Sequence, residues 1–263
     1  MPRLRLYQVD AFTARLFGGN PAAVVPLDDW LDDATLQAIA EENNLAETAF
    51  FVPNEHGFKL RWFTPEVEVK LCGHATLASA FVLFTELEPG RREVKFDTLS
   101  GALAVSAAGD RLVMDFPRWT LEPAAEVPRA LLDGLGAKPQ QVFTTESGTN
   151  LFAVFKNEEA VRALKPDFGL LRTLNAGVIV TAPGKESDCV CRYFAPSYGI
   201  DEDSATGSIH CALTPYWADR ARKNTVHSRQ LSARGAELFC ELKGNRVEIA
   251  GHAVKYLEGW IDV

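Results

Sequence analysis

Glu47 is the residue whose surroundings best suit proton transfer. It stands in a strand-like segment, and Leu45, Ala49 and Phe51 share its side of that strand. We expect burial among these apolar side chains to raise the pKa of the carboxyl group toward neutrality. A carboxyl group with such a pKa can both accept and donate a proton, as general acid and base catalysis requires. A glutamate at a strand end that pairs with an arginine such as Arg61 explains the same pattern equally well.

Two glycines, Gly73 and Gly207, mark positions at which buried helices are expected to begin. His74 follows the first glycine, Ser208 follows the second, and Asp203 lies four residues upstream of the second. A helix start offers unpaired amide groups and a positive dipole end, so each start favours an anionic substrate. The dipole also disfavours an imidazolium, so we expect a neutral His74 ring that can exchange a proton. Taken singly, these residues also have structural explanations, as a packed histidine, a capping serine or a close-packing glycine.

Cys72 directly precedes Gly73, where a helix dipole can lower the pKa of a thiol. Thr206 holds the matching place before Gly207 and cannot act as a matching acid or base, so a two-thiol racemase is incomplete here. No CxxC pair and no zinc-finger spacing occurs among the five cysteines, which are Cys72, Cys189, Cys191, Cys211 and Cys240. We therefore expect neither a disulfide framework nor a metal site, and a reducing cytoplasm fits this pattern best.

An internal repeat connects these residues. Residues 61–65 (RWFTP) match residues 192–196 (RYFAP) at an offset of 131, which is half of the 263-residue chain. The two glycines follow at an offset of 134, and residues 18–25 (GGNPAAVV) match residues 148–155 (GTNLFAVF) at an offset of 130. Solenoid repeats are about 20 to 50 residues long, so this repeat instead predicts two similar domains.

The pattern of apolar residues predicts a sheet and one buried helix in each half. Residues 73–84 are apolar on every side and must form an enclosed helix. Residues 208–218 are the counterpart, in which Pro215 should interrupt the hydrogen bonding. An amphipathic surface helix is expected over residues 31–43, behind aspartates that can cap it. Strands are expected over residues 4–11, 22–26, 45–52, 58–63, 93–96, 101–107 and 111–116.

The predicted fold is α+β, with two pseudo-symmetric domains that each form a barrel-like β-sheet wrapped around a central helix. We place the domains at residues 1–117 and 118–263, with a linking segment over residues 117–127. Because ligands often bind between domains, we expect the two helix starts to face a shared, positively polarised cleft.

The composition excludes several other functions. The chain has 27 Lys and Arg against 35 Asp and Glu, and its net charge of −8 argues against a nucleic-acid partner. No uncharged stretch is longer than residues 71–85, which are fewer than the roughly 20 residues that a membrane-spanning helix needs. The amino terminus lacks a signal-peptide core, so we expect a cytoplasmic protein with no membrane partner. Glycine-rich phosphate loops and the HExxH and GxSxG motifs are also absent.

Four segments of the chain resemble the PhzF-like family of phenazine-biosynthesis isomerases and their relatives. In chain order they are VDAFT…FGGNPAAVV, NNLAETAFF, RWFTPEVEVKLCGHATLA and DEDSATGSIHCAL. The resemblance implies a diaminopimelate-epimerase-like fold, a homodimer, and proton transfer without a cofactor. It places the catalytic glutamate of the family on Glu47. Its substrate-binding residues fall on His74, Asp203 and Ser208 and on the glycines of the two helix starts, Gly73 and Gly207.

Three functions remain open at this point. The first is an isomerase in which Glu47 moves a proton on a small anionic, carboxylated substrate while His74 and Asp203 orient that substrate. The second is a one-base epimerase or racemase that uses Cys72. The third is a non-enzymatic small-molecule binder of the same fold. The ionisable residues argue against the third, because a binder needs no carboxyl group with a tuned pKa.

Overall fold

The computed structural model describes residues 3–263, and the chain divides into two compact units. The first unit contains the chain up to Asp115 together with Ala250–Val263, and the second contains Phe116–Ile249. Strands and helices are mixed in both units, so the predicted α+β class is confirmed. No helix within residues 3–263 is long and apolar enough to cross a membrane.

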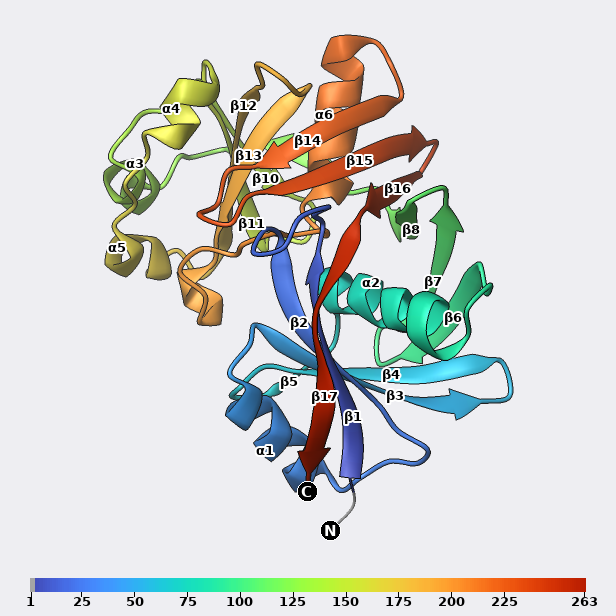
Figure 1. Cartoon of the computed structure of the whole chain (residues 1–263). Helices are drawn as coiled ribbons and strands as arrows, with labels where there is room; N and C mark the ends of the chain where they lie inside the picture. The colour runs from blue at the N-terminus through green and yellow to red at the C-terminus, as the bar shows by residue number, and fades with distance from the viewer. Residues whose placement is uncertain (1–2) are drawn as a thin grey trace. The chain divides into compact units, whose positions relative to one another are not determined.

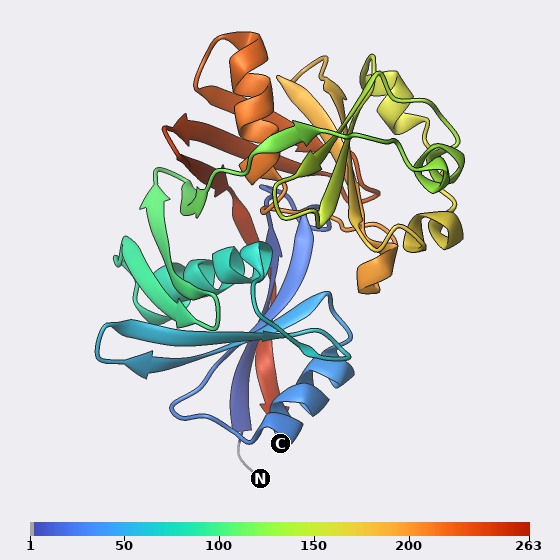
Figure 2. The same cartoon turned by 180° about the vertical axis from the view of Figure 1, so that it is seen from behind.

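Strands of the first unit surround helix α2 (Gly73–Val82), which lies against β1, β2 and β3 in both views (Figure 1, Figure 2). A π-helical turn over Leu83–Leu87 extends this helix. Helix α1 (Asp33–Asn43) packs on the outer side of β3 and β4. The strands are β1 (Arg3–Ala11), β2 (Asn20–Pro26), β3 (Glu47–Asn54), β4 (Gly57–Phe63), β5 (Glu68–Val69), β6 (Glu93–Thr98), β7 (Gly101–Ala108), β8 (Arg111–Pro117) and β17 (Ala253–Asp262).

Burial of α2 follows from its composition, as the sequence predicts. Eight of its ten residues are buried, and two of these besides His74 are polar, Thr76 and Ser79. Their hydroxyl groups donate to the carbonyls of Cys72 and Ala75, one turn earlier, at 2.5 and 2.7 Å. Such local bonds satisfy the hydroxyl groups inside an apolar core, where an unpaired polar group is costly. The helix can therefore be enclosed on all sides.

The second unit repeats this plan around helix α6 (His210–Ala221), which lies beside β14 and β15. Its strands are β9 (Leu121–Pro123), β10 (Gln141–Thr145), β11 (Asn150–Val154), β12 (Gly177–Pro183), β13 (Cys189–Phe194), β14 (Thr225–Gln230), β15 (Ala236–Lys243) and β16 (Arg246–Gly251). Three short helices complete the unit: α3 (Arg129–Leu135), α4 (Glu158–Arg162) and α5 (Phe168–Arg172). In both units a parallel strand pair is followed by an antiparallel one, β2–β3–β4 and β11–β12–β13.

The chain passes twice from one unit to the other, and each time the next strand pairs within the unit that it enters. Strand β9 comes directly after β8 of the first unit but pairs with β10 of the second. Strand β17 comes after β16 and pairs antiparallel with β1 of the first unit, from Arg3–Asp262 to Ala11–Ala253. The expected domains of residues 1–117 and 118–263 therefore differ from this division at the carboxyl terminus. The expected link over residues 117–127 also contains a strand, β9.

Helix α6 begins at His210, and the prediction of a start at Ser208 is wrong. The residues from Gly207 to Ile209 form a tighter turn, in which His210 and Cys211 donate to carbonyls three residues earlier at 3.0 Å. Pro215 lies inside the helix and lacks an amide hydrogen, so the carbonyl of Cys211 loses its usual helical partner. The backbone amide of Trp119 donates to that carbonyl instead, at 2.9 Å. The predicted interruption at Pro215 is thereby confirmed.

Candidate active site

Glu47 and His74 form a buried pair in the first unit. Glu47 is the first residue of β3 and His74 is the second residue of α2, and they are 9% and 6% exposed. Oε2 of Glu47 lies 3.0 Å from Nε2 of His74. The oxygen lies away from the direction of a good hydrogen bond, and neither atom has an aligned partner within the described residues. The contact is therefore electrostatic, and both atoms keep the capacity to bond to a substrate.

The other ring nitrogen of His74 contacts two more side chains. Nδ1 lies 3.2 Å from Nδ2 of Asn20 and 3.5 Å from Sγ of Cys72. Nε2 is therefore the ring nitrogen that faces Glu47, and the donor in each Nδ1 contact depends on which ring nitrogens carry a proton. Asn20 belongs to the repeated GGN block, but its contact with His74 could not be read from the sequence.

The pKa values of this pair are the reverse of those expected from the sequence. Burial acts to raise the pKa of Glu47, but the neighbouring His74, with a smaller contribution from Cys72, outweighs it and lowers the pKa. Burial acts to lower the pKa of His74, yet Cys72 and Glu47 raise it well above 6.5. The predictions of a raised Glu47 pKa and a neutral imidazole are therefore wrong. A carboxylate and an imidazolium stabilise each other here.

Cys72 remains a protonated thiol in this environment. Burial, together with the charge of Glu47, raises its pKa to about 11. A helix dipole was expected to favour the thiolate, but desolvation dominates at this position. Glu47, Cys72 and His74 also bring one ligating atom each to within 4.8 Å of one another, a set that could hold a metal ion.

Asp203 lies in a loop of the second unit that Thr206 and Gln230 hold in place. Thr206 Oγ1 donates to Oδ2 of Asp203 at 2.5 Å. The side chain of Gln230 donates to the carbonyl of Asp203 and accepts from the amide of Thr206, both at 2.8 Å. Gln230 ends β14, and no motif in the sequence connects it to this loop. Asp203, Gly207 and Ser208 thus lie within six residues of chain in the second unit, while in the first unit Glu47 contacts His74, the residue after Gly73.

His210 is a buried residue that sequence reasoning missed. Its Nδ1 donates to the carbonyl of Thr206 and its Nε2 accepts from Ser228 Oγ, both at 2.9 Å. Complete burial lowers its pKa to about 4, so the ring is neutral. These two bonds join the start of α6 to the loop before it and to β14. A histidine inside the apolar run IHCAL is the signal that could have pointed to this role.

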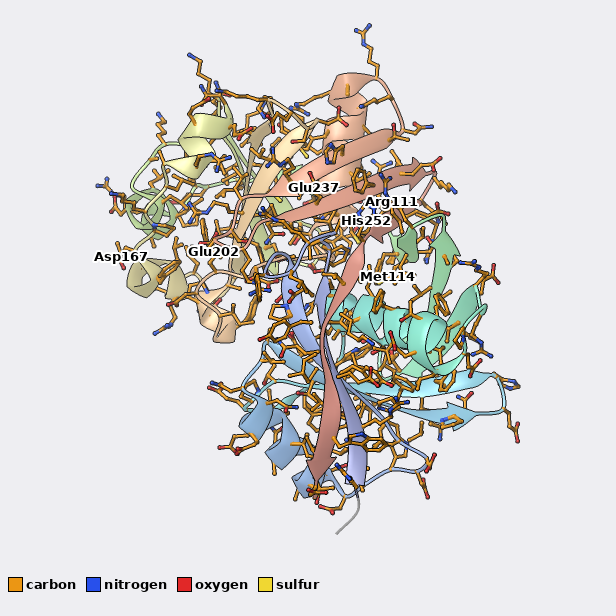
Figure 3. All side chains as sticks on the ribbon, viewed as in Figure 1. Arg111, Met114, Asp167, Glu202, Glu237 and His252 are labelled. Carbon is orange, nitrogen blue, oxygen red and sulfur yellow. The ribbon has the colours of Figure 1, made fainter. Side chains whose placement is uncertain are left out.

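The repeated arginines anchor the loops that lead to the two glycines. Arg61 binds both carboxylate oxygens of Glu68 at 2.7 and 2.8 Å, and Arg192 binds Glu202 with the same distances. Glu202 is labelled in Figure 3. Arg61 also pairs with Asp33, so it is not the partner of Glu47 that one interpretation of the sequence offered. Bidentate pairs of this kind are rigid, and they fix the loop ahead of each helix.

Strands β3 and β12 correspond in the two units, but only β3 begins with an acidic or basic residue. Glu47 is the first residue of β3 and Gly177 is the first residue of β12, and each precedes a residue that pairs with the repeated phenylalanine, Phe63 or Phe194. A side chain at position 177 would collide with the hydroxyl of Tyr193, which lies 2.2 Å from an ideal Cβ. The repeat is therefore chemically asymmetric.

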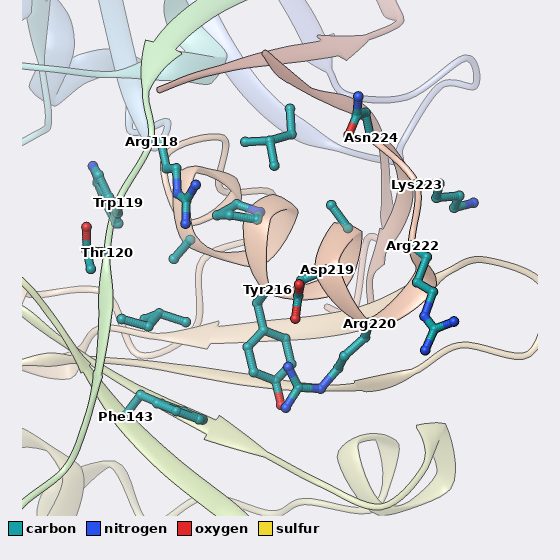
Figure 4. A pocket seen from close by; sticks show the side chains of 15 residues that line it. Arg118, Trp119, Thr120, Phe143, Tyr216, Asp219, Arg220, Arg222, Lys223 and Asn224 are labelled. Carbon is teal, nitrogen blue, oxygen red and sulfur yellow. The ribbon is translucent and has the colours of Figure 1, made fainter. Parts of the chain in front are cut away.

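A separate cavity of about 650 Å³ lies in the second unit, along the later turns of α6 (Figure 4). Tyr216 and Arg220 form one wall, with the guanidinium 3.6 Å from the ring centre, and Arg118 lies in the opposite segment. None of the site residues expected from the sequence lines this cavity. The cavity is therefore separate from the helix starts at Gly73 and Gly207.

Comparisons with known proteins give a consistent result. The family model described as phenazine biosynthesis-like protein matches residues 9–259. An uncharacterized isomerase of Pseudomonas aeruginosa is 51% identical over 262 residues, with 98% of each chain covered.

Solved structures agree in fold. A crystal structure of a phenazine biosynthesis PhzF-family protein from Enterococcus faecalis has a TM-score of 0.95 and 43% identity, with both chains fully covered. A hydroxyproline epimerase from Agrobacterium vitis has a TM-score of 0.64 at 12% identity, covering 98% of this chain and 92% of its own, and shows the fold alone. The expected epimerase-like fold is confirmed.

Proposed function

This chain belongs to the phenazine biosynthesis-like family of isomerases, and from that premise we propose that Glu47 moves a proton on a small carboxylated substrate. The observation that carries the proposal is the buried contact between Glu47 and His74, in which neither facing atom has an aligned hydrogen bond to any residue from 3 to 263. A carboxylate kept ionised at neutral pH is able to accept a proton from carbon. No cofactor is part of this proposal.

The reaction begins with the ionised Glu47 beside a charged His74. Glu47 takes a proton from a carbon atom as that C–H bond breaks, and the electron pair is delocalised into the unsaturated substrate. The proton then returns to a different carbon, which forms the new C–H bond and regenerates the carboxylate. A lowered pKa makes Glu47 a weaker base, but negative charge developing on a nearby substrate raises that pKa during the reaction. The His74 imidazolium stabilises the same negative charge.

Substrate binding is assigned to the two helix-start segments. Gly73 begins α2, a ten-residue helix with no acidic side chain in its first turn, and the positive end of its dipole suits a carboxylate. Gly207, Ser208 and Asp203 are proposed to bind polar groups of the substrate, because the resemblance in sequence places them in that role. Thr206 and Gln230 support the argument, since they hold the Asp203 loop in one arrangement.

Exchange of substrate hydrogen with deuterium oxide tests this proposal. The protein is incubated with a panel of cyclic, unsaturated amino and hydroxy acids, and proton NMR follows loss of C–H signals and appearance of isomers. Glu47→Gln should lower exchange by about two to four orders of magnitude, as expected for loss of a positioned acid–base group. Glu66→Gln, at an exposed position on the loop after β4, is the matched control. Near-normal exchange by the Glu47 variant would remove Glu47 from the mechanism.

A one-base epimerase that uses Cys72 is the second candidate, because the thiol lies beside His74. Its raised pKa of about 11 makes the thiolate scarce at neutral pH and favours the carboxylate as the base. A binder without turnover is the third candidate. It predicts that the wild-type protein exchanges no hydrogen with any acid that it binds.

A further inference from the structure

The residue directly before the glycine makes the same kind of contact in both units. In the first unit Cys72 precedes Gly73, and its Sγ lies 3.5 Å from Nδ1 of His74. In the second unit Thr206 precedes Gly207, and its Oγ1 donates to Asp203 at 2.5 Å. In each case the partner is an ionisable residue of the proposed site.

The two contacts differ in chemistry but constrain the partner in a similar way. Both Cys72 and Thr206 are buried, at 6% and 8% exposure, so their side chains have little freedom to turn away. Cys72 Sγ and Asn20 Nδ2 both contact Nδ1 of His74, which leaves Nε2 as the nitrogen directed to Glu47. Thr206 engages one carboxylate oxygen of Asp203 and thereby fixes the rotation of that group.

We propose that Cys72 and Thr206 are equivalent positioning residues, which hold His74 and Asp203 in the orientation that the reaction uses. This inference deepens the proposed function and rests on it. It assigns Cys72 a role other than that of a base, because a neutral thiol can occupy Nδ1 without releasing its proton. The chemical difference between the two positions matches the partners: a weakly polar sulfur faces an imidazole, and a hydroxyl donor faces a carboxylate.

The inference predicts which substitutions preserve the arrangement. Serine at position 72 replaces the thiol with a hydroxyl group that can contact Nδ1, whereas alanine and valine remove that contact. Serine at position 206 keeps the donor to Asp203, whereas valine has nearly the shape of threonine and lacks it. The conservative and apolar variants at each position therefore separate bonding from packing.

Nitrogen-15 NMR of the histidine rings tests the first position without any substrate. In the wild type and in Cys72→Ser, the Nδ1 signal of His74 should keep its place, because a polar side-chain atom still contacts that nitrogen. In Cys72→Ala and Cys72→Val, the Nδ1 signal should move, because the contact with Sγ is lost. Cys191→Ala removes a buried thiol of the second unit and serves as the control. Unchanged His74 signals in both apolar variants would overturn the assignment of Cys72.

Proton NMR tests the second position. The short bond to Asp203 should give a slowly exchanging, downfield hydroxyl proton in the wild type and in Thr206→Ser, and Thr206→Val should lack it. Detection of the same signal in Thr206→Val would overturn the assignment of Thr206. If the Cys72 variants shift His74 as expected while Glu47→Gln leaves deuterium exchange intact, then the positioning role holds and the proposed function fails. The two claims are thus tested separately.

Discussion

Glu47 and Gly177 are the first residues of two corresponding strands, β3 and β12, and only Glu47 can carry a proton. The hydroxyl of Tyr193 fills the space that a side chain at Gly177 would need, and it donates to Oδ1 of Asn150 at 2.9 Å. A symmetric enzyme could place one base on each side of a substrate carbon. The asymmetry here instead favours one carboxylate that removes a proton and returns it.

The first prediction concerns the packing at Gly177. Gly177→Ala should lower the free energy of unfolding by about 1 to 3 kcal/mol, the usual cost of an added methyl group in a filled core. The new Cβ would lie 2.2 Å from Tyr193 Oη and 2.5 Å from Asn150 Oδ1. Urea unfolding measures the change, and Gly259→Ala, where the nearest atom is 3.8 Å away, is the control. Equal stability of the two variants would show that the site tolerates a side chain.

The second prediction distinguishes the two candidate bases. Cys72→Ser should leave hydrogen exchange largely intact, since the thiol is protonated at neutral pH and the hydroxyl group keeps the contact with His74. Exchange in deuterium oxide, measured beside Glu47→Gln, checks this outcome. A loss as deep as that of the Glu47 variant would favour the epimerase with a cysteine base.

The third prediction is a pH window for the stabilising effect of the Glu47 and His74 pair. The lowered pKa of Glu47 adds stability above about pH 4.5, and this stability is lost as the pH falls through the folded-state pKa. The raised pKa of His74 adds stability that is complete below about pH 6.5 and is lost as the pH rises through its folded-state pKa. Glu47→Gln should therefore lower the melting temperature most between pH 4.5 and 6.5. A constant difference from pH 4 to 9 would contradict this.

The fourth prediction concerns acid stability and His210. The pKa of His210 is lowered to about 4, so between pH 6.5 and 4 the unfolded chain binds a proton that the folded chain does not. The free energy of unfolding should fall in that range by up to about 1.4 kcal/mol per pH unit. His210→Gln should flatten this slope, while His56→Gln at an exposed position should not. Urea unfolding at pH 7, 6 and 5 gives the slopes, and parallel slopes for all three proteins would refute the assignment.

The fifth prediction is the homodimer that the resemblance implies. Light scattering at micromolar concentration should give about twice the chain mass of 28.9 kDa. A mass of one chain across the concentration range would show that the protein is monomeric.

Elements with a regular pattern could be predicted from the sequence, and contacts between distant residues could not. The seven predicted strands and the enclosed helix at Gly73 lie within a few residues of β1 to β4, β6 to β8 and α2. The predicted pKa directions of Glu47 and His74 are wrong because neighbours along the chain indicate burial alone. The opposing charge comes from a residue 27 positions away, which only the packing of α2 against β3 reveals.

Loop contacts were also beyond the sequence. Gln230 binds the Asp203 loop from 27 positions away. The sequence also allowed a pair between Arg61 and Glu47, whereas Arg61 binds Glu68. The turn that delays the start of α6 to His210 has no proline or glycine signal after Ser208 that would mark it.

The position of β17 has a consequence for synthesis of the chain on the ribosome. Strand β1 pairs along its whole length with residues 253–262, which are synthesised after the whole of the second unit. The first unit therefore cannot complete its sheet until residues 253–262 have emerged, although 115 of its residues precede the second unit. The second unit, Phe116–Ile249, has all of its residues before that point. Domains usually fold from the amino terminus onward during synthesis, and this chain should complete its units in the opposite order.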